Sequence, residues 1–571
     1  MAGAALSVAT VAALTSCVQV PDEGAVVEAR QPVRAEQTQA PGNIPPPPRP
    51  GADPAEIVSG FLDAMTATPL QTSTAKGFLS TQAQTDWRPE ERVITYGDRS
   101  PIRGTHHVVV RLRGADQVGA GGQWQGSVPS AGRRLDFPMV REDGQWRISA
   151  APDALIVPRD FFDGNFTDAA LYYFDPTGRI LVPEPVHVPQ GSQLASYLVR
   201  DLLRAPRSVA GSVTQTFIPP GLSVNLSVPV NHKVAEVNLK GSDPGPLAAG
   251  VVKRMLAQLS WTLRQDTTIS AFTLTIAGRA VTDASGASRF PVDSKAFDHY
   301  DPAVEVASGQ AYALRRGRLV SGQIGRPTPV DGPFGRDPLG IGPFAVRLDG
   351  NEVAAVTPTA LLVGPVQGPA PASISRSGTG FLRPAWDFAS RLWEVQDTPS
   401  GAEVAYAAHG RWHQVRMTGL TGKDVRRFLV SRDGSRIVAV LRGSEADRIM
   451  ASRIQYDVNG RAVGTAGTHL IPWVSTGTKR IRDIGWTSPT TIAVLDQLSP
   501  AKAEVRILDV DGSTPPEQAA PTLVSGRVRG LVTSPVDKPY ALQQNGLIDI
   551  SPVDVNKQIQ LEGFHHVTYA G

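Results

Sequence analysis

The single cysteine of the chain, Cys17, follows Leu14-Thr15-Ser16 at the end of an uncharged opening rich in alanine and valine. This spacing is typical of a bacterial lipobox, where a signal peptidase cuts before the cysteine and the sulfur receives a diacylglycerol. The acyl chains then replace the apolar segment as the membrane anchor. We therefore predict a signal peptide at residues 1–16 and a mature protein that begins with Cys17 as an N-palmitoyl and S-diacylglycerol cysteine. Such a protein is anchored by lipid on the extracytoplasmic face of the cell membrane.

Two other interpretations of this opening segment stay open. A lone cysteine can be a small buried hydrophobe, and Met1–Ser16 can be a short transmembrane helix. Against the helix, this stretch is shorter than the about 20 residues that span a bilayer. Met1–Leu6 contains no Lys or Arg, whereas a signal peptide begins with positive charge. We therefore expect the natural start to lie further upstream.

Other residue patterns that carry chemistry in proteins are incomplete here. His409 and His413 have the spacing of a zinc-binding helix, but the glutamate is missing and the intervening glycine favours a strand of a β-sheet. The pairs His106-His107 and His565-His566 would point to opposite faces of a strand. Asp509-Val510-Asp511-Gly512 opens like a calcium loop but lacks the later glutamate, which favours a turn. We predict no catalytic residue, no metal site and no cofactor.

Bulk composition narrows the class of protein. The chain has 571 residues, 41% hydrophobic and 19% charged, which are globular values. This length predicts roughly three or four domains. A net charge of +3 gives no reason to expect a nucleic acid as partner. Because Cys17 is the only thiol, disulfides and cysteine-based zinc sites are excluded.

Residues 17–53 are predicted to be a tether that follows the lipid anchor. The segment contains the run Pro45–Pro48 and Pro50, and it has little apolar surface to bury. Proline-rich chain extends by about 3.1 Å per residue and could reach roughly 100 Å. A stiff spacer of this kind would hold the domains clear of the membrane, although an ordinary disordered segment is compatible with the same residues.

The first folded domain is predicted at residues 54–156. Asp53 is placed as an N-cap, Pro54 follows it, and Glu56 can complete a capping box for a helix. Strand-like runs follow at His107–Arg113, 123–128, Leu135–Val140 and 145–149, with a turn at Glu142-Asp143-Gly144. Helices followed by an antiparallel sheet predict an α+β domain, similar in pattern to the cone-shaped NTF2-like folds.

The second domain is predicted at residues 160–300. Its expected elements are strands at Ala170–Phe174 and Arg179–Glu184, amphipathic helices starting near Leu194 and Leu247, a half-buried strand at Val224–Val228 with a hairpin partner at Val234–Leu239, and a strand at 272–276. With the phrases Tyr172-Tyr173-Phe174, Gly178–Glu184 and Phe217–Gly221, this order resembles the GerMN domain of bacterial envelope proteins.

The remainder, residues 304–571, is predicted to be an all-β propeller. A phrase of strand, polar turn and strand occurs at 344–356 and 428–441, with looser copies at Leu382–Val395, Ile481–Leu495 and Val528–Leu542. Such a period of roughly 40–55 residues is typical of propeller blades. We expect five or six blades, closed by pairing of Phe564–Tyr569 with a strand near Ala311–Leu319.

A lipobox, a proline-rich tether, an NTF2-like domain, a GerMN domain and a propeller, in that order, resemble the LpqB family of actinobacterial lipoproteins. The resemblance implies an accessory protein, not an enzyme, that contacts the extracellular domain of a sensor histidine kinase (MtrB in the MtrA–MtrB two-component system) and affects cell-envelope homeostasis and division. Implied partners are that kinase, the membrane through the anchor and, as an option, the cell wall. The alternatives are a cell-wall glycan-processing enzyme and a passive peptidoglycan-binding scaffold.

Overall fold

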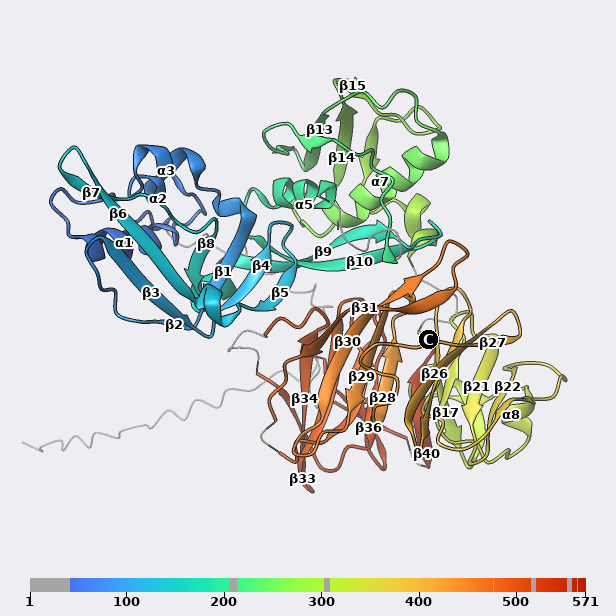
Figure 1. The fold of residues 1–571 in the computed structure, drawn as a ribbon. Helices are drawn as coiled ribbons and strands as arrows, with labels where there is room; N and C mark the ends of the chain where they lie inside the picture. The colour runs from blue at the N-terminus through green and yellow to red at the C-terminus, as the bar shows by residue number, and fades with distance from the viewer. Residues whose placement is uncertain are drawn as a thin grey trace, which may run out of the picture. The chain divides into compact units, whose positions relative to one another are not determined.

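The computed structural model describes residues 42–204, 213–301, 309–475, 477–514, 520–551, 557–561 and 563–571. Cys17, the predicted signal peptide and most of the predicted tether lie outside the described residues. Ile44–Gly571 forms one compact unit. Within it the chain builds two α+β domains and then an all-β domain, coloured blue to cyan, green, and yellow to red in Figure 1. The predicted multidomain fold class is confirmed.

The first domain packs helices against two four-stranded sheets. Helix α1 (Pro54–Ala64) has the predicted capping box, because Asp53 Oδ1 accepts from Glu56 N–H at 2.9 Å and Glu56 Oε2 accepts from Asp53 N–H at 3.0 Å. The strand orders are β5 (Trp124–Ser127), β4 (Asp116–Gly119), β1 (Arg92–Tyr96), β8 (Leu155–Pro158) and β2 (Asp98–Arg99), β3 (His107–Arg113), β6 (Arg134–Glu142), β7 (Gln145–Ile148). Short helices are α2 (Ser73–Lys76), α3 (Thr81–Asp86) and α4 (Arg159–Asn165).

The hairpin between β6 and β7 is turned as predicted. Glu142 pairs with Gln145, so Asp143 and Gly144 form a two-residue loop. Their φ angles of 50° and 74° are both positive, as the favoured hairpin turn requires.

The second domain joins a long two-stranded ribbon to a sheet covered by helices. The ribbon consists of β9 (Phe166–Phe174) and β10 (Leu181–Pro189), paired antiparallel over their whole length. Helices α5 (Leu194–Leu203) and α7 (Ala249–Leu263) share one apolar core with the parallel pair β13 (Val234–Lys240) and β14 (Ala271–Ile276). The sheet is completed by β11 (Ser223–Val224), β12 (Val230–Asn231), β15 (Arg279–Ala280) and β16 (Arg289–Pro291).

Strand β10 continues through three prolines, beyond the short strand predicted at Arg179–Glu184. Pro183 and Pro185 lie opposite Tyr172 and Ala170 of β9. The N–H groups of Tyr172 and Ala170 point away from β10, toward side chains in and just after α7. The opposed prolines therefore occupy positions where an N–H would also point outward, and they remove no hydrogen bond of the ribbon.

The predicted half-buried strand at Val224–Val228 is wrong. Strand β11 ends at Val224, and Leu226 has a φ of 67° with its side chain 96% exposed. The alternating pattern there belongs to a loop. The predicted partner strand is present as β13, and it pairs with β11 over two residues only.

The third domain is a ring of six four-stranded antiparallel sheets in the described part of the chain. Their inner strands contact one another in the order β20, β24, β28, β32, β36, β40 and back to β20. The strands, from the inner edge of each sheet outward, are β40 (Phe564–Tyr569), β17 (Ala311–Arg315), β18 (Arg318–Gly322), β19 (Thr328–Pro329); β20 (Phe344–Val346), β21 (Glu352–Val356), β22 (Ala360–Pro365), β23 (Ser373–Ser377); β24 (Ala385–Trp386), β25 (Leu392–Thr398), β26 (Gly401–Ala408), β27 (Arg411–Gln414); β28 (Val425–Val430), β29 (Arg436–Leu441), β30 (Arg448–Tyr456), β31 (Ala462–Ile471); β32 (Ile481–Trp486), β33 (Thr491–Ser499), β34 (Lys502–Asp509), β35 (Thr522–Ser525); β36 (Gly530–Val532), β37 (Tyr540–Leu542), β38 (Gly546–Asp549), β39 (Gln558–Gln560).

The repeated phrases in the sequence mark the same place in each blade. All five copies fall on the two inner strands of a sheet, from β20–β21 to β36–β37. In the remaining blade the inner strand is β40, which pairs antiparallel with β17 as predicted. Five blades are thus local hairpin arrays, and one is completed by a distant segment.

Candidate functional site

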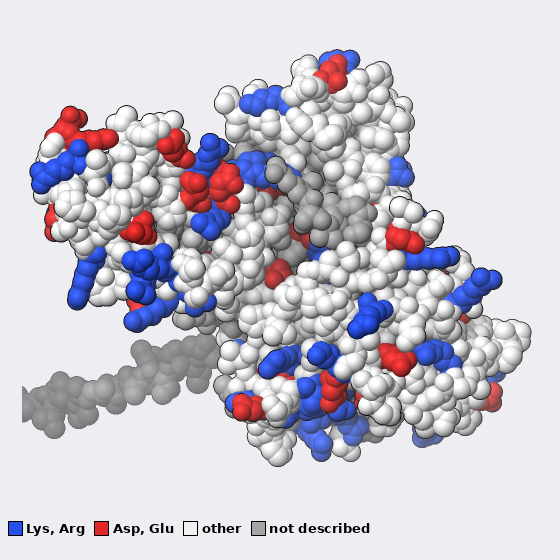
Figure 2. Space-filling view, in the orientation of Figure 1, with Lys and Arg blue, Asp and Glu red and all other residues white. Residues whose placement is uncertain are grey.

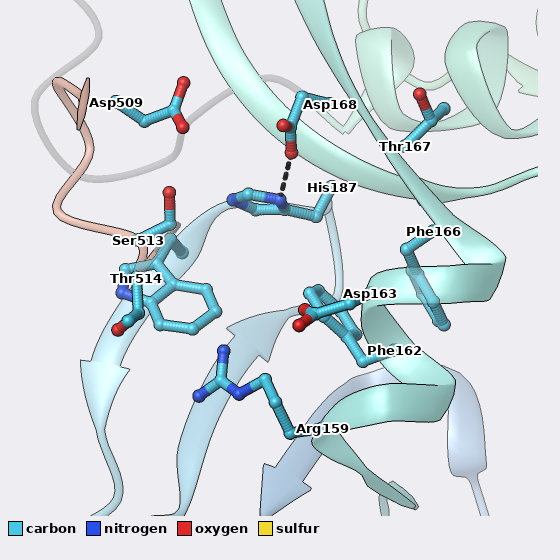
Figure 3. Close-up of a pocket in the computed structure, with 11 residues that line it drawn as sticks. Arg159, Phe162, Asp163, Phe166, Thr167, Asp168, His187, Asp509, Ser513 and Thr514 are labelled. Carbon is cyan, nitrogen blue, oxygen red and sulfur yellow. Dashed lines mark ion pairs between the residues drawn. The ribbon is translucent and has the colours of Figure 1, made fainter. Parts of the chain in front are cut away.

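The candidate site is a cavity of about 130 Å³ where residues of all three domains meet. Its walls come from β5, α4, the ribbon β9–β10, and the end of β34 with the residues that follow it. Figure 3 shows the arrangement of the lining residues, which are Trp124, Arg159, Phe162, Asp163, Phe166, Thr167, Asp168, His187, Asp509, Ser513 and Thr514.

His187 is the contact that joins the three domains. It lies directly opposite Asp168 in the ribbon, and its Nδ1 is 2.7 Å from Asp168 Oδ1. Its Nε2 is 3.0 Å from Oδ2 of Asp511, which belongs to the propeller. The backbone N–H of His187 donates to the carbonyl oxygen of Gly122 in the first domain at 2.8 Å. Gly122 has a φ of 80°, and a Cβ there would lie 3.0 Å from Cβ of Val186, so glycine permits this approach.

The electrostatics of this contact fix His187 as a cation. Burial by itself would lower the pKa of His187, but the hydrogen bonds and charges of Asp168 and Asp511 outweigh burial and raise it to about 10. For Asp511, burial raises the pKa, while the hydrogen bond and charge of His187 outweigh burial and lower it. The imidazolium therefore bridges two carboxylates at neutral pH.

Ser513, His187 and Asp168 have the residue types of a hydrolytic triad but not its chemistry. A catalytic histidine keeps one ring nitrogen free to take the proton of the serine. Here both ring nitrogens face carboxylates, and the protonated ring has no acceptor left. Ser513 instead donates its N–H to Asp511 Oδ1 at 2.9 Å. The cluster joins domains and does not activate a nucleophile.

Two other groups of the cavity are less completely paired. Asp509 ends β34, and burial, followed by the charges of Asp168 and Asp511, raises its pKa to about 7. Arg159 donates through Nη2 to Asp116, and its guanidinium lies 5.5 Å from the ring centre of Trp124. The Nη1 atom of Arg159 is buried and has no hydrogen-bond partner.

A second ionic contact joins the ribbon to the propeller. Glu184 of β10 lies 3.2 Å from Arg436 Nη2 and 2.6 Å from Arg453 Nη2. Arg436 also donates to the carbonyl oxygen of Pro183 at 2.7 Å. The side chain of Glu184 is 11% exposed and that of Arg436 is 4% exposed, so these charges are removed from water.

Of the residues singled out from the sequence, some lie in the candidate site and others lie elsewhere in the chain. Cys17 lies outside the described residues. His409 lies in the β26–β27 turn and not on a strand, while His413 stacks on Tyr406 with ring centres 5.1 Å apart. Asp511 follows a strand end as predicted, yet its partner His187 is distant in sequence. Sequence reasoning missed His187 and Glu184 because each is defined by a partner from another domain. It missed Arg159 because the partner Asp116 is distant in the sequence, although both lie in the first domain.

Within the described ranges, no group of three or more His, Cys, Asp or Glu side chains is arranged to hold a metal ion. None of the helices in the described part of the chain has the length and apolar character needed to cross a bilayer.

Three family models match the chain in the predicted order. The model described as "Lipoprotein LpqB, N-terminal domain" matches residues 47–163, "Sporulation and spore germination" matches 170–282, and "Lipoprotein LpqB beta-propeller domain" matches 317–554. The second match corresponds to the domain predicted to be GerMN. None of these descriptions names an enzyme.

Similar proteins agree with these matches. Curated proteins named Lipoprotein LpqB include that of Thermobifida fusca, 26% identical over 89% of this chain and 90% of the relative, and that of Streptomyces coelicolor, 25% identical over 98% and 96%. Among solved structures, TolB from Acinetobacter baumannii covers 57% of this chain and 86% of that chain, with 13% identity and a TM-score of 0.31. At this TM-score the structural likeness carries no argument.

Proposed function

Since this chain belongs to the LpqB family of lipoproteins, we propose that it binds and modulates the extracellular domain of a two-component sensor kinase of the MtrB type. Its place of action is the extracytoplasmic face of the cell membrane, where a lipid on Cys17 anchors it. Through the kinase it affects cell-envelope homeostasis and division.

The observation that carries this proposal is that β10 joins the propeller through ion pairs and the first domain through a backbone hydrogen bond from His187 to Gly122. His187 and Glu184, both on β10, contact the propeller through Asp511, Arg436 and Arg453. A partner bound to the propeller therefore acts on a body that also contains the first domain, which follows the tether. Coupling of this kind suits a protein that transmits a binding event.

The surface also suits a protein partner. Basic and acidic side chains are interspersed over the visible face of the molecule (Figure 2). Such a face favours a partner with complementary mixed charge over a polyanion, which prefers one continuous basic surface. The paired His187 gives no support to the alternative of a glycan-processing enzyme at this junction.

The proposal is tested with the full lipidated chain and full-length sensor kinases in the same bilayer. We expect the chain to retain one kinase in a pull-down and to change its autophosphorylation rate. Cross-linking in living cells followed by mass spectrometry should give the same pair and its contact face. Glu184→Gln should keep binding but weaken the effect on phosphorylation, because it loosens the contact between β10 and the propeller. Asp243→Asn, which removes an exposed ion pair, is the matched control and should change neither.

Other outcomes separate the alternatives. Repeated failure to retain any kinase would contradict the proposal. Co-sedimentation with purified cell wall without a kinase would instead favour the passive scaffold. Turnover of peptidoglycan fragments would favour the enzyme.

A further inference from the structure

The junction cavity contains one acidic and one basic group whose bonding is incomplete. The guanidinium of Arg159 uses only part of its hydrogen-bonding capacity. Its Nη2 donates to Asp116, while the buried Nη1 has no hydrogen-bond partner. Asp509 faces the same space from the opposite wall (Figure 3). No ion pair to Asp509 is present among the described residues. A buried donor without an acceptor costs free energy unless a ligand or a water satisfies it.

The remaining charges of the cavity are already compensated or negative. The cation of His187 is offset by Asp168 and Asp511, and that of Arg159 is offset by Asp116. The two interactions that the cavity lacks are therefore a positive charge next to Asp509 and an oxygen that accepts a hydrogen bond from Arg159 Nη1.

We propose that the junction cavity binds a small primary ammonium ligand that also carries a hydroxyl or carbonyl oxygen. The ammonium group donates to Asp509, and the oxygen accepts from Arg159 Nη1. Amino alcohols and the amides of small amino acids belong to this chemical class.

The walls and the size of the cavity fit this class. Trp124, Phe162 and Phe166 form an aromatic side, with the rings of Phe162 and Phe166 stacked at 4.5 Å. Aromatic faces attract ammonium groups. A cavity of about 130 Å³ is close to the roughly 150 Å³ that accommodates benzene in another protein. The ligand inside the cavity therefore has about six non-hydrogen atoms, which excludes nucleotides and oligosaccharides.

Binding at this place would tighten the contacts among the three domains. The ligand touches the first domain through Arg159 and the propeller through Asp509, with β9 and β10 between them. A ligand that binds only the joined state stabilises that state by a free energy that grows with the logarithm of its concentration relative to its dissociation constant. The cavity is thus a place where a small molecule can act on domain coupling.

The experiment uses the full chain and two probes that differ in one group, ethanolamine and ethylene glycol. Calorimetric titration at pH 8 should show binding of ethanolamine and none of ethylene glycol. Asp509→Asn should weaken ethanolamine binding at least about tenfold, because it removes a charge-assisted hydrogen bond. Glu445→Gln, an exposed carboxyl on the same propeller, is the matched control and should bind as the unchanged chain does.

The pH dependence provides an independent readout. The charges of Asp168, Asp511 and His187 act on Asp509, while Arg159 and Asp163 line the same cavity, and the pKa of Asp509 is raised to about 7. Ethanolamine binding should therefore strengthen from pH 6 to pH 8 as Asp509 ionises. Arg159→Lys, which keeps the charge next to Asp116, should also weaken binding. Equal binding of ethylene glycol, an unaffected Asp509→Asn variant, or no binding of ethanolamine by the folded chain would each overturn the proposal.

Discussion

Neutralising Glu184 should separate the ribbon from the propeller. In Glu184→Gln the side chain keeps its size but loses the charge that lies between Arg436 and Arg453. The two guanidinium groups then face each other with 4% and 22% of their side chains exposed. Burial already lowers the pKa of Arg453, and Glu184 is the main group that opposes this. The substitution removes that opposing charge.

The expected magnitude follows from the burial of the pair. Removing one partner of a buried ion pair costs about 3–5 kcal/mol, because the remaining charge is left without compensation. Exposed pairs contribute at most about 1 kcal/mol. Arg279 and Asp243, with side chains 61% and 49% exposed, form such a pair within the second domain. Asp243→Asn is therefore the matched control.

Scanning calorimetry and amide hydrogen exchange measure the effect. We expect Glu184→Gln to lower the midpoint of the first unfolding transition by about 2–4 °C per kcal/mol lost. Exchange should become faster at β10, β29 and β30 and stay unchanged in the distant blade β20–β23. Asp243→Asn should alter neither quantity appreciably. If Glu184→Gln matched its control in both measurements, the claim that this buried triad holds the domains together would be refuted.

Other substitutions test the remaining contacts. His187→Gln should speed amide exchange at the junction at neutral pH. In the unchanged chain the pKa of His187 is raised from 6.5 to about 10. The stabilisation that the protonated ring gives to the junction is therefore full below about pH 6.5 and is lost only as the pH rises through about 10. Gly122→Ala should destabilise the same junction by about 1–3 kcal/mol in urea titrations, since the new Cβ meets β10, and an unchanged midpoint would contradict this. Deleting Phe564–Tyr569 should lower the calorimetric midpoint of the propeller, because β17 loses its inner neighbour. Cys17→Ala should leave the chain unprocessed or release it from the membrane with its domains folded, and unchanged membrane retention would contradict the anchor.

Local patterns predicted the elements that depend on neighbouring residues. The capping box at Asp53 and Glu56, the turn at Asp143-Gly144 and the apolar stripe of α7 are each decided within a few residues. The repeated blade phrases belong to this group, since each marks one hairpin. Such features are legible in the sequence because the forces that fix them act between residues close in the chain.

Features that are not decided by neighbouring residues were not predictable in the same way. A strand was predicted at Arg179–Glu184, but β10 runs from Leu181 to Pro189. Pro183 and Pro185 are tolerated because their positions in the ribbon need no N–H donor. The loop at Leu226 imitates a strand in its alternation. His187 and Asp511 meet only after the ribbon and the propeller have folded. Nothing near either residue in the sequence identifies the other.

The pairing of β40 with β17 has a kinetic consequence. The first blade is complete only when β40, which follows all the other blades in the sequence, pairs with β17. Contacts between such remote segments raise the contact order and slow folding, because the intervening chain must be ordered first. Until then β17 presents a bare sheet edge to neighbouring molecules. During its maturation the protein thus passes through an interval of aggregation risk that ends when the ring closes.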